Sequence, residues 1–160
     1  MHPSVAPLLE IYKANANLFL HALADVSPED IVRRPDNNVN SLHFVAGHML
    51  NSRFVLGNLI GIEDKCPWPG LFARGAELKG ISEYPGIEEI RDTWVALSEK
   101  LTGKLAELTE SQLHTKVSAR YPVDDDTVLG GIAFLALHDS YHVGQLGYVR
   151  KVLNYSRLAG

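Results

Sequence analysis

A chain of 160 residues has the length of one ordinary domain and can bury a core without disulfides. Its 46% apolar and 21% charged residues are typical of a soluble globular protein and argue against disorder. A net charge of -4 without any dense run of Lys or Arg disfavours a nucleic-acid partner.

Compartment and membrane association follow from three further features. Cys66 is the only cysteine, so no intrachain disulfide can form, as is usual in a reducing compartment. No charged and apolar leader opens the chain, and no apolar run approaches the roughly 20 residues that span a bilayer. We therefore expect a cytoplasmic protein without a membrane partner.

The first half of the chain predicts two long helices. Apolar residues recur at three- and four-residue steps over residues 7–24, and Ser27-Pro28 then starts a short helix that ends near residues 34–35. The second long helix, residues 41–59, carries Arg53 as its only formal charge. A helix with so little charge is largely buried. Residues 61–86 are rich in Gly and Pro, which indicates a long loop with at most a short helix.

The second half predicts two more long helices. An apolar stripe runs from Ile87 to Leu108, a capping box begins at Thr109, and Thr127 is a suitable cap for a last helix over residues 128–154. Residues 115–126 are irregular, and strand patterns are almost absent. The expected fold is an all-α, antiparallel up-down four-helix bundle in a single domain, residues 1–160. Short extra helices and a long loop between the second and third helices complete it.

His138 and His142 are the first candidates for chemistry. They lie four residues apart on the last helix, so both imidazoles share one face and can reach one metal ion. Leu135, Gln145 and Val149 continue this face, which places the pair inward. Inward imidazoles need a partner, and either a metal ion or backbone and water hydrogen bonds would serve.

A zinc-protease motif does not explain the pair. Asp139 follows the first histidine where that motif has the longer Glu, and no His, Asp, Glu or Cys occurs after His142. A third ligand must therefore come from upstream. His48 is the best candidate, because it lies mid-helix on an apolar line. It also lies about 140° around the helix from Arg53, whose charge we take to mark the outer side, so His48 is expected to point toward the core. The competing interpretation is a structural core histidine.

The remaining candidates have smaller roles. We expect no direct role for four histidines, of which His43 lies off the predicted buried line; the four are His2, His21, His43 and His114. Cys66 is interpreted as a packed loop residue rather than a nucleophile. The apolar residues of its loop suggest a lid over the bundle end: Trp68, Leu71 and Phe72. Side chains that could support the ligands or contact substrate are Tyr141, Gln145 and Ser52.

Two motifs resemble the DinB/YfiT-like family. Residues 41–48, SLHFVAGH, resemble its second-helix motif, and residues 138–146, HDSYHVGQL, resemble its last-helix motif. The resemblance covers nearly the whole chain and implies a four-helix bundle with metal ligands at His48, His138 and His142. It also implies a nickel or zinc ion, a homodimer and, in some members, transfer or isomerisation with a low-molecular-weight thiol. Other members are described as hydrolases, and the loop of residues 61–86 matches no family motif.

Several functions remain open at this point. A metal-dependent enzyme acting on a small molecule is favoured, with thiol S-transfer narrowly ahead of hydrolysis. The reason is that Asp139 is turned by about 100° from His138, so no carboxylate base shares the inward faces. A non-catalytic metal-binding stress-response protein would use the same ligands. A metal-free helical interaction module would not need them.

Overall fold

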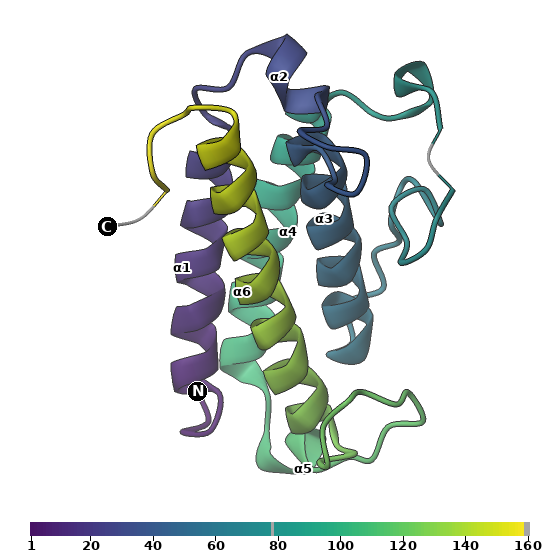
Figure 1. The fold of residues 1–160 in the computed structure, drawn as a ribbon. Helices are drawn as coiled ribbons and strands as arrows, with labels where there is room; N and C mark the ends of the chain where they lie inside the picture. The colour runs from purple at the N-terminus through teal and green to yellow at the C-terminus, as the bar shows by residue number, and fades with distance from the viewer. Residues whose placement is uncertain (78, 159–160) are drawn as a thin grey trace.

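Four long helices form a bundle in the computed structural model, which describes residues 1–77 and 79–158 (Figure 1). The long helices are α1 (Ala6–Leu23), α3 (Leu42–Leu59), α4 (Ile87–Glu107) and α6 (Val128–Val152), and the short ones are α2 (Pro28–Val32), α5 (Glu110–Leu113) and the 3₁₀ helix η1 (Ile81–Glu83). The described residues include no strand and a single isolated bridge, between Lys116 and Thr127. None of the described helices is long and apolar enough to cross a bilayer.

Side-chain caps explain where several helices begin. The hydroxyl of Ser41 accepts a hydrogen bond from the Phe44 amide at the start of α3, and that of Thr127 accepts one from the Gly130 amide at the start of α6. Ser27 and Thr109 cap α2 and α5 in the same way. Each predicted long helix therefore agrees with its observed bounds to within two residues, and the predicted four-helix bundle is confirmed.

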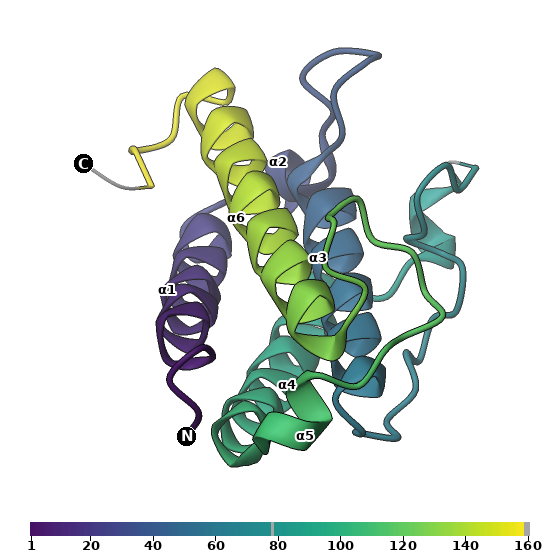
Figure 2. The same ribbon diagram turned by 90° about the horizontal axis from the view of Figure 1, so that it is seen from below.

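The four long helices do not alternate strictly between up and down. Contacts join α6 to both α1 and α3, and α4 to both α1 and α3. The Tyr12 hydroxyl donates a hydrogen bond to the Ile132 carbonyl oxygen, and Arg150 donates one to the Ala22 carbonyl oxygen. Since the later residue of α1 meets the later residue of α6, the two helices run parallel. The loop of residues 60–86 carries the chain back along the bundle, so α3 and α4 also run parallel (Figures 1 and 2). The order is up, down, down, up, which makes α3 and α6 antiparallel neighbours.

The centre of the bundle is apolar, with one buried ion pair. Phe19 of α1 stacks on Trp94 of α4 with ring centroids 3.8 Å apart. Arg53 lies beside them, with its guanidinium carbon 3.8 Å from the Trp94 ring centroid and its Nη2 2.9 Å from Asp139 Oδ2. It also donates to Ser98 and to the Tyr12 carbonyl. The Arg53 side chain thereby links its own helix, α3, to the other three long helices.

Two expectations about α3 are corrected here. Arg53 was used as the marker of the outer side of the helix, yet its side chain is only 3% exposed, because Asp139 neutralises it inside the bundle. His43 was placed off the buried line, but it is 4% exposed and its Nε2 lies 2.8 Å from the Pro85 carbonyl oxygen. Val55, although apolar, is 42% exposed. The apolar residues alone therefore do not show which side of α3 is buried.

Candidate metal centre

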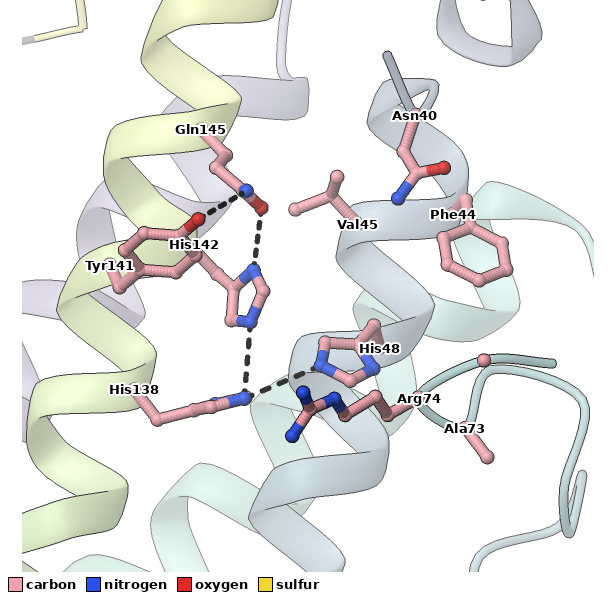
Figure 3. A pocket seen from close by; sticks show the side chains of 11 residues that line it. Asn40, Phe44, Val45, His48, Ala73, Arg74, His138, Tyr141, His142 and Gln145 are labelled. Carbon is pink, nitrogen blue, oxygen red and sulfur yellow. Dashed lines mark hydrogen bonds between the residues drawn. The ribbon is translucent and has the colours of Figure 1, made fainter. Parts of the chain in front are cut away.

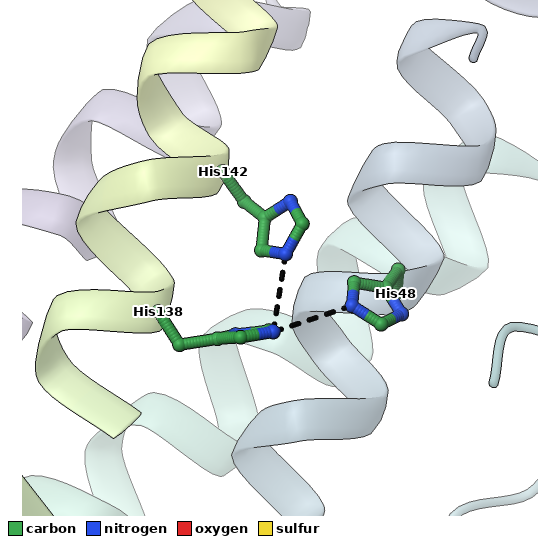
Figure 4. A group of neighbouring side chains, drawn as sticks. All are labelled: His48, His138 and His142. Atoms are coloured by element: carbon green, nitrogen blue, oxygen red, sulfur yellow. Dashed lines mark hydrogen bonds between the residues drawn. The ribbon is translucent and has the colours of Figure 1, made fainter. Parts of the chain in front are cut away.

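Three histidines from two helices converge in the bundle (Figure 4). His48 comes from α3, and His138 and His142 come from successive turns of α6. His138 Nε2 lies 3.1 Å from His142 Nε2 and 3.4 Å from His48 Nε2. One ring nitrogen of each residue lies within 4.8 Å of those of the other two. The structure thus brings together the three residues that the sequence singled out.

Hydrogen bonds at Nδ1 of two of the rings direct Nε2 of those rings toward the centre. His48 Nδ1 lies 2.7 Å from the Phe72 carbonyl oxygen, and His142 Nδ1 lies 2.7 Å from Gln145 Oε1. Both oxygens can only accept, so each Nδ1 carries the hydrogen and each Nε2 presents its lone pair inward. His138 Nδ1 is buried and has no partner among the described residues.

The donor set fits a divalent ion. Two imidazole nitrogens that bind one zinc ion tetrahedrally, each at 2.0–2.1 Å, lie about 3.3 Å apart. The observed separations of 3.1 and 3.4 Å agree with this spacing. Three neutral imidazoles suit zinc and nickel alike, and they leave coordination positions free for water or substrate. The three histidines could therefore hold a metal ion.

The protein environment keeps His138 and His142 neutral. Burial, together with the repulsion of a second positive charge by the neighbouring His142 and His48, lowers the pKa of His138 to about 4. Burial also lowers the pKa of His142, although Gln145 acts in the opposite direction. At neutral pH these two rings are therefore unprotonated, the form that binds a metal ion.

The three imidazoles line a cavity of about 430 Å³ (Figure 3). Tyr141 and Gln145 line it too, and the Gln145 amide nitrogen donates to the Tyr141 hydroxyl over 3.2 Å. Ser52 does not line it; its hydroxyl donates to the His48 carbonyl oxygen one turn earlier. The other lining residues come from α3, the chain before it and the long loop: Asn40, Phe44, Val45, Ala73, Arg74 and Gly75.

The long loop contributes parts of the site that sequence reasoning missed. Phe72 packs against the side of α3 rather than over the bundle end, and its carbonyl oxygen accepts a hydrogen bond from His48 Nδ1. Arg74 lines the cavity. No sequence signal could have found either, because the loop matches no motif and a backbone carbonyl has no signature. Cys66 is half-buried, and burial raises the pKa of its thiol, which disfavours the thiolate form.

The fold and the site together define a helical-bundle protein with a candidate three-histidine metal centre. The chain belongs to the DinB superfamily, whose family model matches residues 11–146. Among solved structures it is similar to YfiT from Bacillus subtilis, described as a probable metal-dependent hydrolase with an unusual four-helix bundle topology. That match has a TM-score of 0.70 and 14% identity over 98% of this chain and 91% of the other, and it supports the fold. No curated protein matches the sequence.

Proposed function

We propose that this protein binds a divalent ion, nickel or zinc, through His48, His138 and His142 and hydrolyses a small-molecule substrate. The convergence of three Nε2 atoms on one cavity carries this proposal. The cavity volume of about 430 Å³ is within the range of small-molecule sites. A pocket of this kind beside the ligands favours an enzyme over a storage or structural role. The description of YfiT as a probable metal-dependent hydrolase supports hydrolysis ahead of thiol S-transfer, the reverse of the order that the sequence favoured.

The chain's own residues prepare the site for this chemistry. A bound divalent ion supplies Lewis acidity, which lowers the pKa of a water or thiol in contact with it toward neutrality. Gln145 orients the His142 ring through Nδ1. The Tyr141 hydroxyl accepts from Gln145, which leaves its own hydrogen available for an oxygen atom of the substrate in the cavity.

Thiol S-transfer is the second candidate, because none of the described residues that line the cavity is a carboxylate. Asp139 is not available as a base, since it is buried against Arg53. A thiol needs less help from a base than water does, so a site without a carboxylate suits a low-molecular-weight thiol as co-substrate.

A panel on the metal-loaded protein separates the two functions. Metal content is measured first, and the protein is then assayed with esters and amides and, separately, with thiols plus an electrophile. Hydrolysis without S-transfer is the expected result. S-transfer alone would favour the second candidate, and bound metal without either activity would leave a non-catalytic metal-binding protein.

Acid is expected to release the metal. Protonated imidazoles cannot ligate, and because burial depresses the pKa of His138 to about 4, release should occur below the ordinary histidine pKa of about 6.5. We expect half-release between about pH 4 and pH 6. Metal content after equilibration at stepped pH, with circular dichroism to confirm that the fold persists, measures this. Full occupancy at pH 4 would contradict ligation by imidazoles alone.

We also propose a homodimer that forms through α6. Three apolar residues of α1 lie outside its buried stripe and could suggest an interface there, but they are half-buried and pack on the core: Leu8, Leu18 and Leu20. On α6, by contrast, four large apolar side chains are exposed on one side: Leu137, Tyr141, Tyr148 and Val152. Their positions are symmetric about residues 144–145, so an antiparallel two-fold contact would pair Leu137 with Val152 and Tyr141 with Tyr148 of the second copy. Gly144, exposed at the centre, permits close approach.

Light scattering tests the dimer. The protein should have twice the chain mass, and the double change Leu137→Glu and Tyr148→Glu should yield a monomer with unchanged helix content, since both side chains are exposed. Ile11→Glu, at an exposed apolar residue on α1, is the matched control and should leave the dimer intact. A monomeric wild-type protein at working concentration would refute the proposal.

A further inference from the structure

We propose that Arg74 binds an anionic group of the substrate, so that the substrate class is small molecules with a carboxylate or similar anion near the reacting group. This inference rests on the proposed function, because it takes the ion at the three histidines as the reactive centre. It depends on three features of the long loop: how Phe72 anchors it, where Arg74 then lies, and which charges surround Arg74.

Phe72 fixes the loop to α3. Phe72 is 1% exposed, and its ring packs among the aromatic rings of His43, Phe44, Trp68 and Tyr84. Gly47 makes room for it, because a Cβ atom at that position would come within 2.3 Å of the Phe72 ring. The Phe72 ring thus occupies the space that a side chain at residue 47 would fill, and it is closely packed there. The middle of the loop is therefore held by packing, although it lacks regular structure.

The same residue ties the loop to the metal site. The Phe72 carbonyl oxygen accepts the hydrogen bond from His48 Nδ1 over 2.7 Å. Arg74 follows two residues later, and its side chain extends from the loop into the cavity (Figure 3). At Gly75 the backbone adopts φ +74, a left-handed conformation that suits glycine and turns the chain after Arg74. The loop thus delivers one cation beside the three imidazoles.

The charges around Arg74 favour an anionic ligand. Arg53 and Arg150 are both paired with carboxylates, those of Asp139 and Asp25. Arg74 forms no ion pair or hydrogen bond with any residue that the structure describes, and no described acidic residue lines the cavity. A guanidinium presents a planar fork of donors that matches a carboxylate or phosphate. With a divalent ion in place the cavity is positive, which attracts anions.

Paired thiol probes on the cobalt-loaded protein test this proposal. A thiol that binds cobalt produces a charge-transfer absorption band, so affinity is measured by titration without any turnover. The probes are mercaptoacetate, 3-mercaptopropionate and 4-mercaptobutyrate, each compared with the mercaptoalcohol of the same length. We expect at least one acid to bind about tenfold more tightly than its alcohol, as a charge-assisted hydrogen bond would give. Arg74→Gln should abolish this preference, and Arg74→Lys should retain part of it.

Lys65→Gln is the matched control, because Lys65 is an exposed cation on the same loop that does not line the cavity. It should leave the preference unchanged, and cobalt affinity should be the same in wild type and Arg74→Gln. Equal affinities for acids and alcohols in wild type, or equal losses in Arg74→Gln and Lys65→Gln, would overturn the role of Arg74 and leave the metal site standing. Failure of wild type to bind cobalt would instead overturn the proposed function and, with it, this inference.

Discussion

Replacement of His48 with alanine is expected to lower the affinity of the protein for its divalent ion by more than about 100-fold, beyond the 10–100-fold typical of residues that only support a ligand. The reason is geometric: the change removes one of three nitrogens that lie within 4.8 Å of one another, and the distances of 3.1 and 3.4 Å from His138 Nε2 to the other two match a shared ion. Two imidazoles four residues apart on one helix remain, and they bind a single ion far more weakly. Competition titration against a chromophoric chelator measures the difference, and enzymatic activity should be lost with the metal.

The control for this experiment is His21→Ala, because His21 is an exposed histidine on α1 that does not line the cavity. It should leave metal affinity unchanged. His43→Ala is a weaker control, because His43 is buried and bonded to the Pro85 carbonyl, so its loss should lower stability while metal affinity persists. Wild-type affinity in His48→Ala together with lost affinity in His43→Ala would show that α3 presents a different histidine to the ion.

The largest effect on stability is expected from Asp139→Ala. Asp139 and Arg53 are 2% and 3% exposed, and removal of the carboxylate leaves the guanidinium charged and buried. Breaking a buried pair in this way costs about 3–5 kcal/mol of the free energy of unfolding. Arg53 also contacts Ser98, the Tyr12 carbonyl and the Trp94 ring, so its displacement would disturb all four long helices. Urea unfolding of the metal-free protein measures the loss.

Two further variants serve as comparisons for Asp139→Ala. Asp64→Ala breaks the exposed pair with Lys100 and should cost less than about 1 kcal/mol, as surface ion pairs do. The double change Arg53→Met and Asp139→Leu removes both charges and should recover much of the lost stability, because no unpaired charge is then buried. A loss below about 1 kcal/mol in Asp139→Ala would mean that Arg53 finds another partner or reaches water.

Local sequence patterns predicted the helices and two of the three converging histidines. Helix periodicity and caps such as Ser41 and Thr127 are local signals, so the bounds of the long helices agreed with the structure. The spacing of His138 and His142 is also local, since one helix places both on one face. The structure places His48 beside this pair, although its selection relied on the false premise that Arg53 marks an outward side.

Other features of the site depend on contacts between residues remote in the sequence. Arg53 is buried because Asp139, 86 residues later, lies opposite it, and no helical pattern records that pairing. His48 lies beside His138, 90 residues away, because α3 and α6 are neighbours in the bundle. They run antiparallel, since the long loop carries the chain back along the bundle before α4 begins. Arg74 enters the cavity because Phe72 packs over Gly47. In each case a long-range contact determines whether a polar side chain is buried, bonded or free for a ligand, so periodicity within a single segment could not reveal it.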